Sequence, residues 1–149
     1  MNVWIFDDED YYQQMAYQLC EECLEKANYK LDAQLRWPPD FLSLNQEGHI
    51  SNINDLPDMI ILDLFVGDAR KSDAIEIYKQ IRKQEKAHFG RNRSIVIVWS
   101  GAYAAAADIE KYLDEQAVND KRLLLVKIKS EIKLKNAIAG AYERLLEEE

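Results

Sequence analysis

Residues 57–64 read Pro-Asp-Met-Ile-Ile-Leu-Asp-Leu, and within them residues 59–64 form an almost purely apolar run that reaches a carboxylate at Asp63. Apolar runs without alternation are typical of strands that are covered on both faces of a sheet. Sheets of this kind are parallel, and their ligands bind at the carboxyl ends of the strands. The stretch therefore predicts a parallel α/β domain with Asp63 at the edge where a ligand would bind.

Strand-like and helix-like segments alternate along the rest of the chain. Strands are predicted at 2–6, 59–64, 94–99 and 122–128, and the alternation of Leu31, Ala33 and Leu35 indicates another. Amphipathic helices are predicted at about 9–27, 72–87, 103–116 and 131–147. This alternation predicts an α/β fold, an open doubly wound parallel sheet with helices on both faces.

Two serines mark helix starts, because Ser72 and Ser130 stand where an N-cap is expected. The inner face of the last helix is expected to consist of Ile132, Ala137, Ile138, Ala141 and Leu145.

Length and charge exclude several classes of protein. The 149 residues fit a single domain, 1–149, and 48% of them are apolar, which is enough for a core. The net charge of −8 argues against nucleic-acid binding, which needs a basic surface. No apolar run approaches the ~20 residues of a membrane span, and the acidic N-terminal stretch is unlike a signal peptide. We therefore expect a cytoplasmic protein with no direct contact to nucleic acid or membrane.

Two cysteines, Cys20 and Cys23, have the C-x-x-C spacing of some metal and redox sites. They lie in the middle of a predicted helix, and a four-cysteine zinc site would need a second pair, which the sequence lacks. We interpret them as small apolar residues of the helix.

The residues that follow the predicted strands suit phosphoryl transfer. The strands lead into Asp7 and Asp8, into Asp63, into Ser100 and Gly101, and into Lys127. Three carboxylates at one edge repel one another unless a cation shares the site, and hard oxygen ligands suit Mg²⁺. A lysine and a hydroxyl opposite the metal would complete a cradle for a phosphoryl group, and a glycine would allow close approach.

Each residue has a simpler interpretation when it is taken alone. The acidic pair would cap a helix, Asp63 would be a loop carboxylate, Ser100 a turn residue, and Lys127 a lysine whose stem packs on the sheet. Their combination at four strand ends, in the expected order, favours a functional site.

With these motifs the sequence resembles the receiver domain of two-component response regulators over essentially its whole length. The motifs are Val-Trp-Ile-Phe-Asp-Asp-Glu-Asp (3–10), Pro-Asp-Met-Ile-Ile-Leu-Asp-Leu (57–64), Ile-Val-Ile-Val-Trp-Ser-Gly-Ala (95–102) and Leu-Leu-Leu-Val-Lys (123–127). The resemblance implies a flavodoxin-like (βα)5 sheet in the strand order 2-1-3-4-5, with five helices.

The resemblance also implies a role for each matching residue. Asp63 would accept the phosphoryl group, and Mg²⁺ would be bound by Asp63, by Asp8, by Asp7 directly or through water, and by the backbone carbonyl of Phe65. The phosphoryl group would be contacted by Ser100, Gly101 and Lys127. The donor would be a sensor histidine kinase or a phosphotransfer protein, and the domain would act as a switch rather than as an enzyme with turnover.

The chain departs from the family pattern at several positions. Gly67 and Ile128 replace usual prolines, and we expect a trans peptide bond before Ile128 because a non-proline cis bond costs about 3–4 kcal/mol. Leu124 replaces a common aromatic switch residue, and residues 28–56 are longer than the corresponding family segment.

Three functions are compatible with this pattern. The first is an active phospho-switch, which would dock an effector or a second copy through helix four, strand five and helix five. That face offers Tyr103, Tyr112, Leu124 and Lys129. The second is a pseudo-receiver that signals by docking without phosphorylation. The third is a haloacid-dehalogenase-type hydrolase, which is disfavoured because Phe65 replaces that family's second aspartate.

Overall fold

A computed structural model describes residues 1–7, 9–25, 32–36, 56–63, 71–99, 119–126 and 130–148. These residues form, in chain order, β1 (Asn2–Phe6), α1 (Asp10–Glu25), β2 (Asp32–Arg36), β3 (Met59–Leu62), α4 (Lys71–Phe89), β4 (Ile95–Trp99), β5 (Leu123–Val126) and α7 (Glu131–Glu147). The predicted helix at 103–116 and the bond before Ile128 lie outside the described residues.

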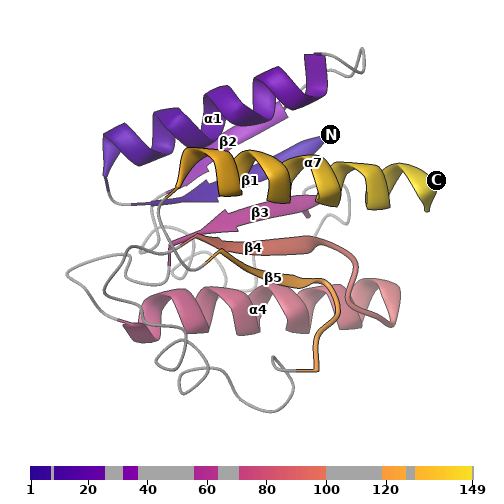
Figure 1. The fold of residues 1–149 in the computed structure, drawn as a ribbon. Coiled ribbons are helices and arrows are strands. Elements are labelled where there is room, and N and C mark those ends of the chain that lie inside the picture. Colours follow the sequence, from indigo (N-terminus) through magenta and orange to yellow (C-terminus); the bar gives the residue numbers. More distant parts are fainter. Residues whose placement is uncertain are drawn as a thin grey trace.

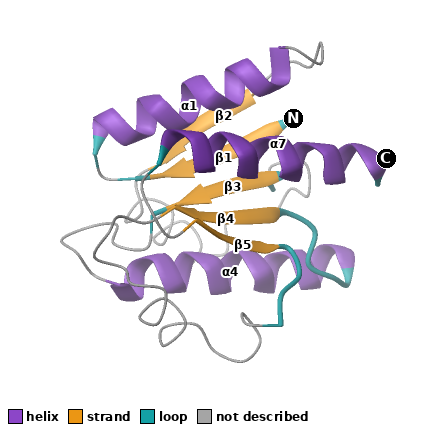
Figure 2. Ribbon diagram, in the orientation of Figure 1, coloured by secondary structure: helices purple, strands orange, loops and turns teal. Residues whose placement is uncertain are grey.

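All five strands form one parallel sheet in the order β2-β1-β3-β4-β5. Helices α1 and α7 lie side by side on one face of this sheet, and α4 covers the other face (Figures 1 and 2). The α/β class with a parallel sheet, predicted from the apolar runs, is therefore confirmed. Because the strands are parallel, the carboxyl ends of β1, β3, β4 and β5 all lie at the same edge of the sheet.

Side-chain alternation divides the core into two halves. The half beneath α1 and α7 is built from every second strand residue, among them Val3, Ile61 and Ile97. The intervening residues point to the face that α4 covers, and both sets are buried in β1, β3 and β4, apart from half-buried Asn2. This two-sided burial explains why these strands are almost purely apolar in sequence.

For α7, the predicted N-cap is confirmed, but the buried face differs in part from the predicted one. Ser130 is the N-cap of α7, and its hydroxyl accepts a hydrogen bond from the Lys133 amide. The expectation for Ile132 was wrong, since this side chain is 73% exposed. The buried residues are Leu134, Ile138, Ala141 and Tyr142. Ile132 precedes Leu134 by two residues, about 200° around the helix, and therefore faces outward.

The prediction for Ser72 also needs correction, because α4 begins one residue earlier, at Lys71. The serine is thus a residue of the first turn and not the N-cap, because the helical backbone extends one residue further toward the N-terminus.

The two cysteines have the structural role expected from the sequence. Neither forms a disulfide, both lie within α1, and Cys20 is fully buried in the core. Burial, with a contribution from neighbouring Cys23, raises the pKa of the Cys20 thiol to about 12. A thiol with this pKa is protonated at neutral pH and is a poor nucleophile or metal ligand.

A buried polar network fastens α4 to β4 and to the turn before β5. The Arg82 guanidinium donates to the Asp120 carboxylate at 2.8 Å, to Glu85 at 2.6 Å and to the Ser94 carbonyl at 2.9 Å. The Tyr78 hydroxyl donates to the same Asp120 carboxylate at 2.5 Å. All the charged groups of this network are therefore paired, as burial requires.

Within the described residues, no helix combines the length and the apolar composition that crossing a membrane requires.

Candidate functional site

Two of the predicted site residues, Asp7 and Asp63, follow neighbouring strands at the carboxyl edge of the sheet. Phe6 pairs with Leu62 in the β1–β3 register, and the Asp63 amide donates to the Phe6 carbonyl at 2.9 Å. Asp7 and Asp63 therefore occupy adjacent positions one residue beyond this pair. Both are largely buried, with 2% of Asp7 and 9% of Asp63 exposed.

The start of α1 holds Asp7 in place. The Glu9 amide donates to the Asp7 carboxylate at 3.0 Å, a local turn that aspartate commonly forms two residues before the donor. The Gln13 side-chain amide of α1 donates to the Asp7 backbone carbonyl, so Asp7 is held by two hydrogen bonds, one from the residue before α1 and one from within it. The N-terminal end of a helix also favours a nearby negative charge.

Gln13 is a site residue that the sequence did not reveal. Its contact spans six residues and depends on how α1 turns back over the end of β1. Helical periodicity places Gln13 on α1, but it does not say that this side chain reaches the strand end.

An aromatic side chain from β4 extends the same row of the sheet. Val98 pairs with Leu62, and the next residue, Trp99, pairs with Val126 of β5. Asp63, Trp99 and Val126 therefore share one row, and residues of one row point to the same face of a parallel sheet. That face is the one covered by α1 and α7.

Tyr12 of α1 packs edge-on against Trp99, with ring centroids 5.4 Å apart and an interplanar angle of 89°. This edge-to-face contact is a favourable geometry for two aromatic rings. The contact holds the fluorescent Trp99 side chain in the same row of the sheet as Asp63, next to Asp7.

The remaining predicted site residues, Asp8, Phe65, Ser100, Gly101 and Lys127, lie outside the described residues. In the chain, Ser100 directly follows Trp99 and Lys127 directly follows Val126. Within the described part of the chain, no group of three or more His, Cys, Asp or Glu side chains is placed to hold a metal ion. The structure thus places two of the predicted metal ligands on adjacent strand ends.

This pair of carboxylates has a clear chemical consequence. Two negative side chains at neighbouring, nearly buried positions repel each other unless a cation lies between or beside them. Their oxygens are the hard ligands that Mg²⁺ and similar divalent ions prefer. The donor set at this edge therefore fits a divalent cation.

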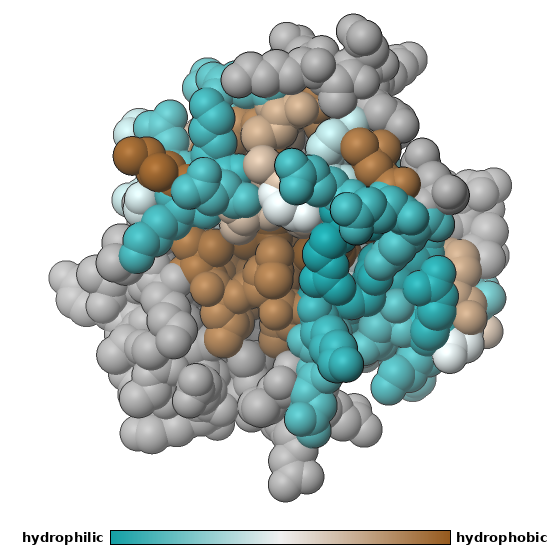
Figure 3. All heavy atoms as spheres, turned by 45° about the vertical axis from the view of Figure 1, so that its right-hand side comes forward, coloured by the Kyte–Doolittle hydropathy of each residue, from teal (hydrophilic) through white to brown (hydrophobic). Residues whose placement is uncertain are grey.

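The predicted partner face is described only in part. Leu124 of β5 is half-buried and packs against the core, whereas Tyr103, Tyr112 and Lys129 lie outside the described residues. Figure 3 shows one face of the molecule, on which a patch of hydrophobic residues lies beside a patch of hydrophilic residues.

Comparison with known proteins supports the fold. No family model matches the chain, and no curated protein matches its sequence. Among solved structures it is similar to the Mn²⁺-bound form of response regulator Rcp1, with a TM-score of 0.52 and 17% sequence identity. The similarity covers 98% of this chain and 94% of the other. The chain thus has a receiver-like fold.

Proposed function

We propose that this chain is a response-regulator receiver domain that accepts a phosphoryl group on Asp63 in a Mg²⁺-dependent reaction. The observation that carries the proposal is the placement of Asp7 and Asp63 on adjacent parallel strand ends of a receiver-like fold. A histidine kinase or a phosphotransfer protein would supply the phosphoryl group. The finer (βα)5 doubly wound arrangement with five helices belongs to this proposal.

Residues at the carboxyl edge of the sheet would bind the metal ion. The metal ligands would be Asp7, Asp8, Asp63 and the Phe65 carbonyl. Bound Mg²⁺ would supply positive charge beside the transferred phosphoryl group. The solved response regulator with a similar fold contains Mn²⁺, another divalent ion that oxygen ligands suit.

The reaction itself is a transfer between two nucleophiles. An Asp63 carboxylate oxygen forms a bond to phosphorus as the bond from phosphorus to the donor's histidine nitrogen breaks, and the released imidazole takes up a proton. Lys127, Ser100 and the Gly101 backbone would contact the phosphoryl oxygens and stabilise their charge. Water later hydrolyses the acyl phosphate, which releases inorganic phosphate and restores the carboxylate. The phosphorylated form would serve as a signalling state, so the protein would act as a switch rather than as an enzyme with turnover.

The switch would signal through a docking face. Phosphorylation adds charge at the carboxyl edge and changes the balance between two conformations of the segments beside it. The output would be an effector protein or a second copy of the chain, bound at the face that contains β5 and α7. The pseudo-receiver remains the second candidate, because Gly67, Leu124 and Ile128 depart from the family pattern.

Labelling with a small phosphodonor tests the proposal. The protein is incubated with acetyl phosphate and Mg²⁺, and its intact mass is measured beside Asp63→Asn and a sample with EDTA. We expect one phosphoryl adduct that requires both Mg²⁺ and Asp63. Asp10→Asn, an exposed carboxylate in the first turn of α1, serves as the matched control and should label normally.

Undiminished labelling of Asp63→Asn would show that another residue is the acceptor. A folded wild-type protein that gains no adduct from acetyl phosphate or from a phosphohistidine donor would favour the pseudo-receiver.

A further inference from the structure

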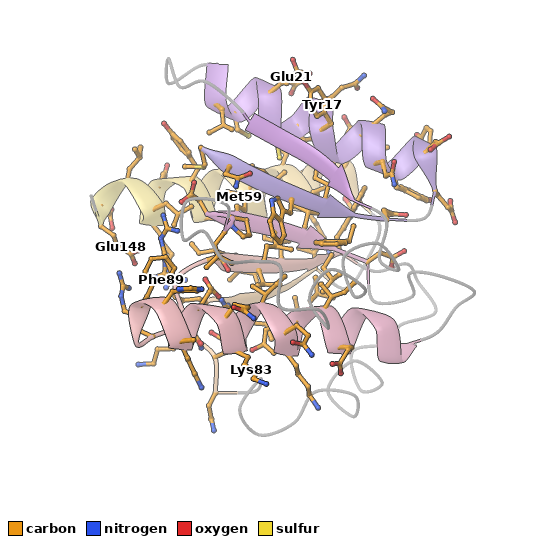
Figure 4. All side chains as sticks on the ribbon, turned by 180° about the vertical axis from the view of Figure 1, so that it is seen from behind. Tyr17, Glu21, Met59, Lys83, Phe89 and Glu148 are labelled. Atoms are coloured by element: carbon orange, nitrogen blue, oxygen red, sulfur yellow. The ribbon has the colours of Figure 1, made fainter. Side chains whose placement is uncertain are left out.

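The amino ends of the strands, at the edge opposite Asp63, surround a pocket of about 280 Å³. Its lining residues are Met1, Asp58, Arg91, Arg93, Arg122, Leu145 and Glu148. In Figure 4 this end of the molecule is marked by Glu148 at the end of α7 and Phe89 at the end of α4. Three guanidinium groups face two carboxylates here, so the pocket is locally cationic although the chain carries a net charge of −8.

Two of the arginines are held rigidly by the fold. Arg93 donates to the Asp58 carboxylate at 2.8 Å, and its guanidinium lies 4.8 Å from the centre of the Phe89 ring. Arg122 donates from Nε to the Arg93 backbone carbonyl at 2.7 Å. These contacts orient the remaining Arg122 nitrogens as a planar fork, the shape that matches a carboxylate or a phosphate.

Glu148 occupies this fork in the structure. Its two carboxylate oxygens accept from the two terminal Arg122 nitrogens at 2.5 and 2.8 Å. The hydrogen bonds from Arg122 hold the pKa of Glu148 below its ordinary value, and nearby Arg144 and Arg91 add to this effect. The Glu148 carboxylate is thus an anion bound in the pocket by its own chain.

The two partners differ in how firmly they are held. The Arg122 side chain is 12% exposed, whereas the Glu148 side chain is 40% exposed and belongs to the cap residue of α7. Water reaches the Glu148 carboxylate and screens its attraction to Arg122, so a dissolved anion can compete with it for the fork.

Arg91 gives the pocket one more positive side chain than it has negative ones. It is exposed, lines the same pocket and makes no ion pair with any residue in the described ranges. An incoming anion would meet the Arg122 fork and the Arg91 charge, and Leu145 would provide an apolar surface for the rest of the ligand.

We propose that this pocket binds a small organic anion, carried by a carboxylate or a phosphate group, and that Glu148 occupies the site in its absence. The site is separate from Asp63 and does not depend on the function proposed above. Binding would release the end of α7 from Arg122, and α7 packs against α1 and the sheet.

Anion titration of three proteins tests this site. Inorganic phosphate and citrate are titrated at constant ionic strength into wild type, Glu148→Gln and Glu147→Gln, and amide shifts are followed by NMR. Removal of the internal competitor should tighten binding about tenfold in Glu148→Gln. Glu147→Gln changes the net charge by the same amount at an exposed neighbour outside the pocket lining and should match wild type. Comparison of the two ligands shows which anion the fork prefers.

Arg91→Gln in the Glu148→Gln background provides the second measurement, and it should weaken binding several-fold because one cation is lost. Arg91 is exposed and makes no ion pair among the described residues, so this variant should fold. Equal affinity of Glu148→Gln and Glu147→Gln, or no effect of Arg91→Gln, would overturn the proposal. Asp63→Asn should bind the anion normally, so the outcome is independent of the labelling experiment.

Discussion

Two neighbouring glutamines of α1, Gln13 and Gln14, have the same chemistry and different surroundings. The Gln13 amide donates to the Asp7 carbonyl, whereas Gln14 is exposed. The sequence distinguishes them only by helical phase. The contact with Asp7 makes Gln13 a positioning residue for the carboxyl edge, because it ties the helix to the end of β1.

The Gln13→Ala variant should weaken Mg²⁺ binding and slow labelling of Asp63. A lost hydrogen bond is worth about 1 kcal/mol, which corresponds to roughly a fivefold effect. The measurement is a Mg²⁺ titration followed by fluorescence, since Trp99 lies in the row that contains Asp63, together with the rate of adduct formation. The matched control, Gln14→Ala, should behave as wild type.

A purely structural Gln13 would give a different result. Its replacement would then lower the free energy of unfolding while the Mg²⁺ affinity of the folded protein stayed unchanged.

At the scale of elements, α7 shows how packing selects one face of a helix. The sequence offers two apolar residues close together near its start, Ile132 and Leu134. Leu134 is fully buried, and Ile132 is exposed. Leu134 lies on the same face of the helix as Ile138 and Ala141, which pack against the sheet and α1. Ile132 lies on the opposite face and is therefore left in solvent.

Leu134→Ala should therefore be costly and Ile132→Ala nearly neutral. Removal of a buried leucine side chain lowers the free energy of unfolding by about 2–5 kcal/mol. An exposed substitution changes it by less than about 0.5 kcal/mol. Urea denaturation of both variants measures the difference, and a large loss in Ile132→Ala would mean that this side chain is covered.

At the scale of the whole molecule, the two edges of the sheet have opposite character. The carboxyl edge carries the paired carboxylates Asp7 and Asp63. The amino edge carries the arginine pocket and, beside it, the buried network around Arg82 and Asp120. That network joins α4 to the turn before β5, so it links segments 38 residues apart.

Asp120 should make stability depend on pH. Burial alone would raise its pKa, but hydrogen bonds from Tyr78 and Arg82 and the charge of Arg82 hold the pKa below the ordinary value of 3.8. A carboxyl group whose pKa is lower in the folded state stabilises the fold above its unfolded pKa and loses this contribution as pH falls through its folded pKa.

The Asp120→Asn variant should thus be less stable than wild type at neutral pH, and the difference should shrink below about pH 4. Urea denaturation of both proteins at several pH values measures it. A difference that stays constant into acid would show that the stabilisation does not depend on the charge of Asp120. The matched control, Asp10→Asn, removes an exposed carboxylate that lies outside this network.

By itself, the sequence determined the α/β class, the parallel sheet and the position of Asp7 and Asp63 at strand ends. It did so because strands buried on both faces must be apolar along their whole length, and the first polar residue then marks the end of the strand. The N-cap Ser130 was predictable for a similar local reason, since the cap bonds within its own helical turn.

Only the tertiary structure decided which residues meet across the chain. The Gln13 contact with Asp7, the choice of Leu134 over Ile132, and the fork of Arg122 on Glu148 each depend on how two elements pack. Local patterns carry periodicity and turn chemistry, but they do not contain the distance between elements. Those distances come from burying one apolar core, and they create both the carboxylate edge and the arginine pocket.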